Sequence, residues 1–474
     1  MTTPESRVLS TPIRSTLIGA VCAAAIWIIM GVLWFARTSW DSSATSIGGF
    51  LGITALYLFS LGFYLNIDSA GIDKRWGGVR HRHTIQKWMA LAGFIVAVIS
   101  PCLSGKDING PQAMNIVAIV SLVFIGITVF ITLCIQLATA WPTLRKLPFP
   151  LSWIVDPPYD VWRVFQDLLG VWVTILFAYA YTACTPLCDD AVMAPIFSLL
   201  TVFGVVSWIY SSFLQRFVFK GRRMVITGVR SLASKTVEIT LEPTDDKPVR
   251  KGLPGQYVCL SAPGVVNGPH PFMEISAPGR DILQIAVKVS GIDTRVLRET
   301  VGVGMKVHVR GPYGDLDLRR ATPRQVWIAA GIGITPFISW LRAIDALIDE
   351  KIHRSGVRSS KIRKVASQEV MEQLGIHKVD LWFFHHGEPA YAEELYYWES
   401  RFSWLEVHIR DTTQVDRQTA AEIIEETPGL DPANLDGVSA VLCGPAEMMR
   451  DYSQNLDELG VYPVSYTHLR AHET

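Results

Sequence analysis

The residues Gly331-Ile-Gly-Ile-Thr-Pro336 could hold a phosphate group. They follow a short apolar run, Gln325 to Ala330, and precede a segment with the periodicity of a helix. The run predicts a buried strand, the two glycines permit a tight turn, and Pro336 suits the first turn of a helix. Such a turn leaves backbone N–H groups and a helix N-terminus facing the space beyond the strand, which suits a dinucleotide pyrophosphate. Taken alone, two glycines before a helix are more typical of a plain strand-to-helix connection.

The segments before this turn predict a small β-barrel. Short alternating stretches with strand propensity are separated by turn residues and by one helical piece, at residues 293–301. The expected strands span residues 224–229, 236–241, 256–261, 282–289 and 305–309. Repeated short strands of this kind predict an antiparallel barrel over residues 216–322.

Residues 323–463 alternate strands with helices, which predicts a doubly wound parallel α/β domain. The expected strands are 325–330, 379–384, 405–409 and 440–443, and the expected helices are 336–352, 391–400, 419–426 and 447–459. The basic stretch 351–364 is interpreted as a solvated or partly disordered insertion, with contact to anionic lipid as the alternative. Residues 464–474 fit no element and look like read-through from a cloning adapter, so they are left out of the fold.

The first 215 residues predict a six-helix transmembrane bundle. Six apolar segments without a charged residue lie at 17–36, 47–67, 88–105, 113–141, 168–188 and 191–215. A helix needs about 20 residues to cross the hydrocarbon core of a bilayer. Basic residues gather after the second, fourth and sixth segments, which places both termini and the C-terminal half in the cytoplasm. The absence of ionisable residues within the segments disfavours an ion pump or transporter.

Charge and cysteine content exclude other classes. Lys plus Arg and Asp plus Glu both number 43, so no nucleic-acid partner is expected. Cys184-Thr-Pro-Leu-Cys188 either forms an external disulfide or carries two unrelated thiols, and two cysteines alone make a poor metal site.

Further motifs surround the glycine turn in a fixed order. Upstream are Leu253-Pro-Gly-Gln-Tyr257, His270-Pro-Phe-Met-Glu-Ile-Ser-Ala-Pro278, Lys288-Val-Ser-Gly-Ile-Asp-Thr294 and Gly311-Pro-Tyr-Gly314, and downstream is Leu442-Cys-Gly-Pro445. In this order, behind six apolar segments, they resemble the ferric reductase and NADPH oxidase branch of the ferredoxin–NADP reductase superfamily. The resemblance covers essentially residues 1–463 and is strongest from Leu253 onward.

The resemblance implies an FAD-binding barrel, an NAD(P)-binding α/β domain, and NADH or NADPH as the electron donor. It places the flavin beside Tyr257, His270, Pro271, Phe272 and Ser276, and the flavin pyrophosphate at Lys288, Gly291 and Thr294. It places the nicotinamide dinucleotide at Gly331, Gly333, Thr335 and Pro336, with Gly444 and Pro445 close by. Cys443 takes the catalytic position near the nicotinamide ring, where a small side chain allows close stacking for hydride transfer.

Several features depart from the family pattern. Met273 and Glu274 follow His-Pro-Phe where a Ser or Thr hydroxyl is usual, and the tail from residue 464 replaces the terminal strand that usually ends in an aromatic residue. The resemblance also implies haem-ligating histidine pairs in the membrane. Of the eleven histidines only His81 and His83 precede the barrel, and both are expected in a cytoplasmic loop. Haem is therefore not expected, and no metal site is assigned.

These observations predict a membrane-bound, flavin-dependent NAD(P)H oxidoreductase. Its electrons would pass through FAD to ferric iron, a quinone or a partner protein, such as a separate haem-bearing membrane subunit. The choice between NADH and NADPH stays open among the candidates His385, His386 and Arg410. The alternative function is a haem-less flavin-binding redox sensor, or a partner-binding subunit without turnover of its own.

Overall fold

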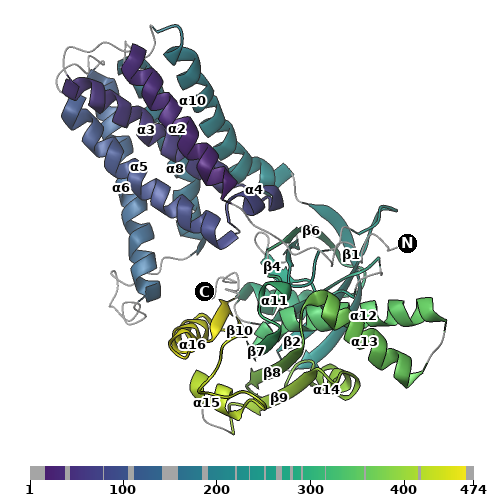
Figure 1. Ribbon diagram of the computed structural model, residues 1–474. Coiled ribbons are helices and arrows are strands. Elements are labelled where there is room, and N and C mark those ends of the chain that lie inside the picture. Colours follow the sequence, from purple (N-terminus) through teal and green to yellow (C-terminus); the bar gives the residue numbers. More distant parts are fainter. Residues whose placement is uncertain are drawn as a thin grey trace. The chain divides into compact units, whose positions relative to one another are not determined.

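The computed structural model forms two compact units, of residues 15–219 and of residue 220 onward (Figure 1). The residues it describes are 17–37, 43–77, 79–104, 112–140, 159–183, 190–218, 221–233, 235–249, 252–262, 270–277, 281–289, 292–314, 316–356, 359–414 and 418–465.

Long apolar helices build the first unit. They are α2 (Ile18–Arg37), α3 (Ser43–Leu65), α5 (Val79–Ser104), α6 (Gln112–Ala140), α8 (Tyr159–Ala183) and α10 (Met193–Ile209), with a short α4 (Ala70–Arg75) and a π-helical extension, η3 (Tyr210–Val218). In the described part of the chain seven helices are long and apolar enough to cross a membrane, and six of them are these. Their outer faces are apolar, since Val21, Ile119 and Leu199 are more than 60% exposed. The unit therefore fits a multi-pass membrane protein.

A buried arginine closes one end of this bundle. Arg82 on α5 is only 2% exposed, donates to the carbonyl oxygen of Leu65 at 2.9 Å, and pairs with Asp73 at 2.8 Å. Its charge is thereby matched by a carboxylate and by the carbonyl end of α3. The prediction that His81 and His83 lie in a loop is wrong, because this pairing allows the basic stretch to continue as the first turns of α5.

The predicted pair Cys184 and Cys188 lies outside the described residues. Cys102, near the end of α5, is exposed and free.

The second unit begins with a six-stranded antiparallel sheet. Its strands are β1 (Arg222–Ala233), β2 (Thr236–Pro243), β3 (Tyr257–Ser261), β4 (His270–Met273), β5 (Leu283–Lys288) and β6 (Lys306–Tyr313), with α11 (Ile292–Thr300) after β5. Their order is β4-β3-β6-β1-β2-β5. The two edges meet where the Ile275 N–H donates to the Gln284 carbonyl at 2.9 Å. This contact curls the sheet toward a barrel, as the strand pattern predicts.

A five-stranded parallel sheet follows, covered by helices. The strands are β7 (Arg324–Ala330), β8 (Lys378–His385), β9 (Leu405–Asp411), β10 (Val438–Cys443) and β11 (Tyr462–Ser465), in the order β11-β10-β7-β8-β9. The helices are α12 (Thr335–Ser355), α13 (Ser360–Leu374), α14 (Ala392–Arg401), α15 (Ala420–Glu426) and α16 (Ala446–Glu458). The seventh apolar helix counted above is α12, and two thirds (67%) of its apolar stretch is buried inside this unit. It is therefore a core helix.

The structure changes two predictions about this domain. The basic stretch 351–364 is helical where the structure describes it, at the end of α12 and the start of α13. Lys351 lies 2.7 Å from Glu369 and Arg363 lies 2.7 Å from Asp349, while Lys361 and Lys364 are exposed, as expected for a solvated stretch. Val464, assigned to the foreign tail, instead pairs with β10 as part of the edge strand β11.

The two sheets share one apolar core. Met273, Ile275 and Ala286 of the barrel belong to the same buried cluster as Phe337 and Ile338 of α12. A continuous core of this kind fixes the segment after β4 against the helix that follows the glycine turn.

Candidate functional site

The glycine turn lies at the point where the strand order of the parallel sheet reverses. Gly331–Ile334 forms one 3-10 turn, η5, which joins the end of β7 directly to α12. The chain runs outward from β7 to β8 and β9 on one side and to β10 and β11 on the other. In open α/β sheets, ligands bind beyond the carboxyl ends of the strands at such a switch point.

Both glycines are required by the geometry of this turn. Gly331 has a φ of +56°, in the left-handed region that favours glycine. A Cβ on Gly333 would lie 2.2 Å from the carbonyl oxygen of Cys443 and 2.9 Å from the backbone nitrogen of Gly444. The turn therefore packs directly on the backbone after β10, and the two motifs form one surface.

Thr335 and Pro336 are buried beneath this surface and support the turn. Thr335 is 1% exposed, and its hydroxyl donates to the Ile332 carbonyl at 2.8 Å. Pro336 is buried at the start of α12, where it needs no N–H partner. A phosphate at this turn would thus meet backbone N–H groups and the positive end of α12.

Lys288 lies at the same turn. It ends β5 with an exposed side chain, and its Nζ lies 2.9 Å from the place a Cβ on Gly331 would occupy. Sequence reasoning assigned Lys288 to the flavin pyrophosphate, whereas the structure brings its ammonium group to the nucleotide turn. Of the two residues assigned with it, Thr294 is buried on α11 and Gly291 lies outside the described residues.

Cys443 presents its backbone, not its thiol, to the turn. The side chain is 0% exposed and packs in the core shared by the two sheets. Burial raises the pKa of the thiol, so it stays protonated at neutral pH. Gly444 is tightly packed too, because a Cβ there would lie 3.1 Å from the Cβ of Ala330. Pro445 is exposed and precedes α16.

The barrel residues assigned to the flavin divide between surface and core. His270 and Pro271 are partly exposed on β4, while Phe272 packs inside the barrel. Met273, the departure from the family pattern, is 3% exposed in the shared core. The Ser276 hydroxyl accepts the Gln284 N–H at 2.7 Å, which fixes the segment after β4 to β5.

An aromatic pair was missed in part by sequence reasoning. Tyr257 on β3 is directly opposite Tyr313 on β6, and their ring centroids are 5.7 Å apart. Tyr313 belongs to the Gly-Pro-Tyr-Gly motif, which was a usable signal. The ring planes are inclined by 40° and Tyr257 is buried, so the pair packs as part of the barrel and Tyr313 is its partly exposed member.

Two of the three candidates for nucleotide preference have partners within the chain, and the third, His386, is exposed. His385 Nδ1 lies 2.6 Å from the Gly387 carbonyl oxygen. The Arg410 guanidinium lies 5.3 Å from the Trp382 ring and 3.5 Å from the Glu426 carboxylate.

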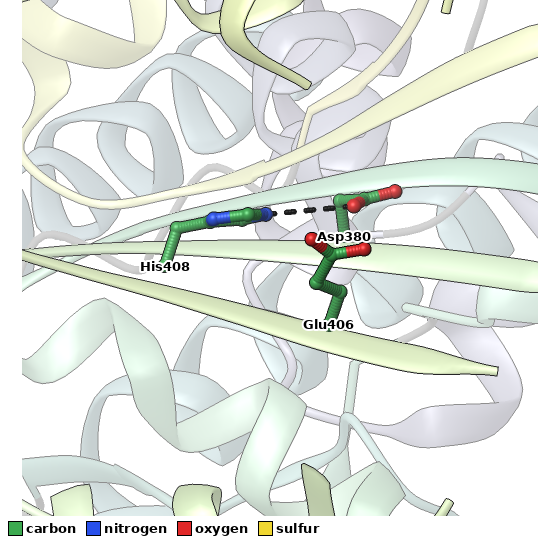
Figure 2. Close-up of side chains that lie close together, drawn as sticks. All are labelled: Asp380, Glu406 and His408. Atoms are coloured by element: carbon green, nitrogen blue, oxygen red, sulfur yellow. Dashed lines mark hydrogen bonds and ion pairs between the residues drawn. The ribbon is translucent and has the colours of Figure 1, made fainter. Parts of the chain in front are cut away.

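Asp380, Glu406 and His408 form a second polar cluster, with ligand atoms within 4.8 Å of one another (Figure 2). His408 Nε2 lies 3.5 Å from Asp380, and Arg324 also pairs with Asp380. Lys378 lies 3.3 Å from Glu406. The cations needed to balance both carboxylates are therefore protein side chains, and the cluster is an ion-pair network near the start of β8 and β9.

We predict that Gly333→Ala destabilises the reductase unit. The new methyl group would overlap backbone atoms of Cys443, which cannot rotate away, and overpacking of this kind costs about 1–3 kcal/mol. Denaturant titration would measure the free energy of unfolding. Gly302→Ala is the matched control, because nothing lies within 4 Å of a Cβ there. Equal stability of the two variants would contradict the close packing described above.

We also predict that Cys443 resists alkylation in the native protein. Its thiol is buried and its pKa is raised, so the reactive thiolate is scarce at pH 8.5. Because the unfolded thiol ionises near pH 8.5, this group lowers stability only as the pH rises above that value. Peptide mass mapping after iodoacetamide should find Cys443 modified only when the chain is unfolded first. Native modification would show that the thiol faces the solvent.

Comparison with known proteins gives matches to curated proteins but none to a family model. The chain is 27% identical over 233 residues to a flavohaemoprotein of Bacillus subtilis, which covers 48% of this chain and 53% of that protein. It is 32% identical over 141 residues to NADPH oxidase 3 of Rattus norvegicus, covering 27% of this chain and 24% of that protein. It is 24% identical over 255 residues to the toluate 1,2-dioxygenase electron transfer component of Pseudomonas putida, covering 52% and 66%.

Solved structures give weaker similarities. The flavohaem-like FAD/NAD-binding domain of nitric oxide dioxygenase from Vibrio cholerae is 22% identical, with a TM-score of 0.39, over 52% of this chain and 98% of that one. The cytochrome b5 reductase domain of Ulva prolifera nitrate reductase is 17% identical, with a TM-score of 0.38, over 52% and 97%.

The chain spans between a quarter and two thirds of the length of the curated relatives named above. The similarity to flavohaemoproteins and NADPH oxidases confirms the predicted resemblance to the ferric reductase and NADPH oxidase branch of the ferredoxin–NADP reductase superfamily.

Proposed function

We propose that this protein is a membrane-bound flavoprotein oxidoreductase that takes electrons from NADH or NADPH and delivers them to an acceptor through FAD. The observation that carries the proposal is the close packing of the glycine turn on Cys443 and Gly444 at the switch point of the parallel sheet. It makes a backbone surface of the kind that holds a dinucleotide pyrophosphate.

The residues at the turn would bind and orient the nucleotide. The N-terminus of α12 would face its pyrophosphate, and the ammonium group of Lys288 would balance the phosphate charge from the barrel side. Because Gly331 and Gly333 have no side chains, the pyrophosphate could approach the backbone of the turn closely. Cys443 would act by packing, because its buried side chain lies in the core while its backbone carbonyl meets the turn.

The barrel would hold the FAD. The partly exposed Tyr313 packs beside the buried Tyr257 of β3, and the partly exposed His270 and Pro271 lie on the neighbouring strand β4. Bound FAD supplies the conversion of a two-electron hydride into single electrons. Curated relatives named as a flavohaemoprotein and as a dioxygenase electron transfer component support this assignment.

The membrane unit limits the choice of acceptor. We propose six spans with both termini and the reductase unit on the cytoplasmic side, from the basic residues at the ends of α3, α6 and η3. Crossing about 30 Å of hydrocarbon without a carrier is a long step for an electron. Quinone in the bilayer, a ferric chelate on the cytoplasmic side, and a haem-bearing partner subunit are therefore the acceptors to test.

A second candidate function is a redox sensor or partner-binding subunit that binds flavin without turnover. The observation that favours it is Met273, which replaces the usual hydroxyl and is buried in the shared core. Tight flavin binding without reduction by either nucleotide would support the sensor.

An absorption spectrum of the protein in mild detergent tests the proposal. We expect a bound flavin, identified as FAD after release, whose absorption bleaches on anaerobic addition of NADH or NADPH. Adding quinone or a ferric chelate should then restore the oxidised spectrum. Protein that carries no flavin after mild purification would contradict the proposal.

Lys288→Met separates the two possible roles of this lysine. If Lys288 binds the nucleotide phosphate, the KM for NAD(P)H should rise about ten- to a hundred-fold, as expected for one lost charged hydrogen bond, while flavin content stays unchanged. Lys306→Met is the control, because Lys306 is an exposed lysine on β6 of the same barrel. Loss of flavin with an unchanged KM would show instead that Lys288 binds the flavin pyrophosphate.

A further inference from the structure

An arginine on α12, the helix that follows the glycine turn, contacts residues 270–277 of the barrel, which are called the flavin segment below. Arg342 lies on α12, and its side chain is 11% exposed. One terminal nitrogen donates to the Ile275 carbonyl at 3.0 Å and to the Gln284 side chain at 3.3 Å, both in the barrel. The other lies 2.9 Å from Glu238 on β2 and 2.9 Å from Glu394 on α14. Arg342 thus joins barrel strands to two helices of the α/β half.

Two further residues complete the network. Arg230 on β1 lies 2.8 Å from Glu394 and 3.3 Å from Glu238, and the Tyr391 hydroxyl donates to Glu238 at 3.2 Å. Two guanidinium groups therefore balance two carboxylates. Burial by itself would lower the pKa of Arg342, but its bonds and charges with Glu394 and Glu238 raise it. Arg342 therefore stays charged across the physiological pH range.

Backbone geometry also indicates that the network is held in place. Tyr391 has a φ of +65° and is the one residue other than glycine with a positive φ in the described part of the chain. A bulky residue adopts this conformation only where its surroundings fix it. Its ring lies 5.6 Å from the Arg342 guanidinium and is 5% exposed.

The position of Arg342 along α12 gives the network a role in the site. It follows Thr335 by seven residues on a continuous helix, which corresponds to roughly 10 Å at 1.5 Å per residue. Ile275 follows His270-Pro-Phe-Met by two residues. One rigid helix therefore carries the nucleotide turn at its start and the contact with the flavin segment two turns later.

We propose that Arg342 is a positioning residue that sets the spacing between the nucleotide turn and the flavin segment, so that hydride transfer occurs at the right distance. This inference rests on the proposed function. A buried ion network is often no more stabilising than apolar side chains of similar size. A role in positioning accounts for the ion network better than a role in stability, because its hydrogen bonds connect the barrel to the α/β half.

Arg342→Met tests the role of the network in the full-length protein. Methionine retains the apolar stem and removes all contacts with Ile275, Glu238 and Glu394. We expect flavin content and the nucleotide Kd to stay unchanged, while the limiting rate of anaerobic flavin bleaching falls about 10²-fold, the loss typical of a small misplacement. Arg342→Lys should recover part of the rate, because it keeps the charge without the planar fork.

Arg401→Met is the matched control. Arg401 on α14 pairs with Asp345 of α12 at 3.2 Å, a partly buried ion pair that lies wholly inside the α/β half. This variant should bleach at the wild-type rate. If Arg342→Met fails to fold, Glu394→Gln keeps the shape of the network, removes one charge and should slow bleaching in the same direction.

Hydrogen exchange of residues 270–277 gives a readout that needs no activity. We expect faster exchange there in Arg342→Met than in wild type or Arg401→Met. Wild-type bleaching rates in Arg342→Met and Glu394→Gln would overturn the positioning role. If the wild-type protein itself does not reduce flavin, the proposed function is overturned instead. In that case the exchange measurement still tests the contact, and unchanged exchange of residues 270–277 in Arg342→Met would overturn it.

Discussion

The close approach of Gly333 to the carbonyl group of Cys443 is the constraint on which the reductase half depends. At 2.2 Å from that oxygen there is no room for a Cβ, so a glycine must stand where β7 turns into α12. The contact brings the ends of β7 and β10 together at the point where the strand order reverses. It also fixes the first turn of α12, and hence the direction in which that helix carries Arg342 toward the barrel. The nucleotide surface and the contact between the two halves are thus set by the same turn.

Hydrophobic periodicity and helix-start residues predicted the elements whose signals lie within the element itself. Residues 325–330 were predicted as a buried strand and lie in β7, and the helix predicted from Pro336 begins one residue earlier, at Thr335. The short alternating stretches predicted β1, β2, β3, β5 and β6 of the barrel but not the four-residue strand β4. The motifs at 331–336 and 442–445 were placed on the correct turns, and the structure adds that they touch through backbone atoms.

Interactions between distant residues account for what the sequence did not predict. The sequence does not show that Glu369 and Asp349 pair with Lys351 and Arg363 of the basic stretch. His81 and His83 were assigned to a loop because the buried pairing of Arg82 with Asp73 cannot be seen in the sequence. Edge strand β11 has four residues and is recognisable only once β10 is beside it. Arg342 pairs with Glu394 and Glu238, which lie 52 and 104 positions away along the chain, and it belongs to no motif.

The central claim is that a nicotinamide held at the glycine turn passes hydride directly to a flavin held by the barrel. Anaerobic stopped-flow reduction with NADH or NADPH carrying deuterium on the transferred position of C4 tests this claim most directly. Direct transfer predicts that flavin bleaching in a single turnover is slowed by the deuterium, because the C–H bond breaks in the measured step. A protein that binds flavin and nucleotide together but shows no bleaching with either nucleotide would contradict the account.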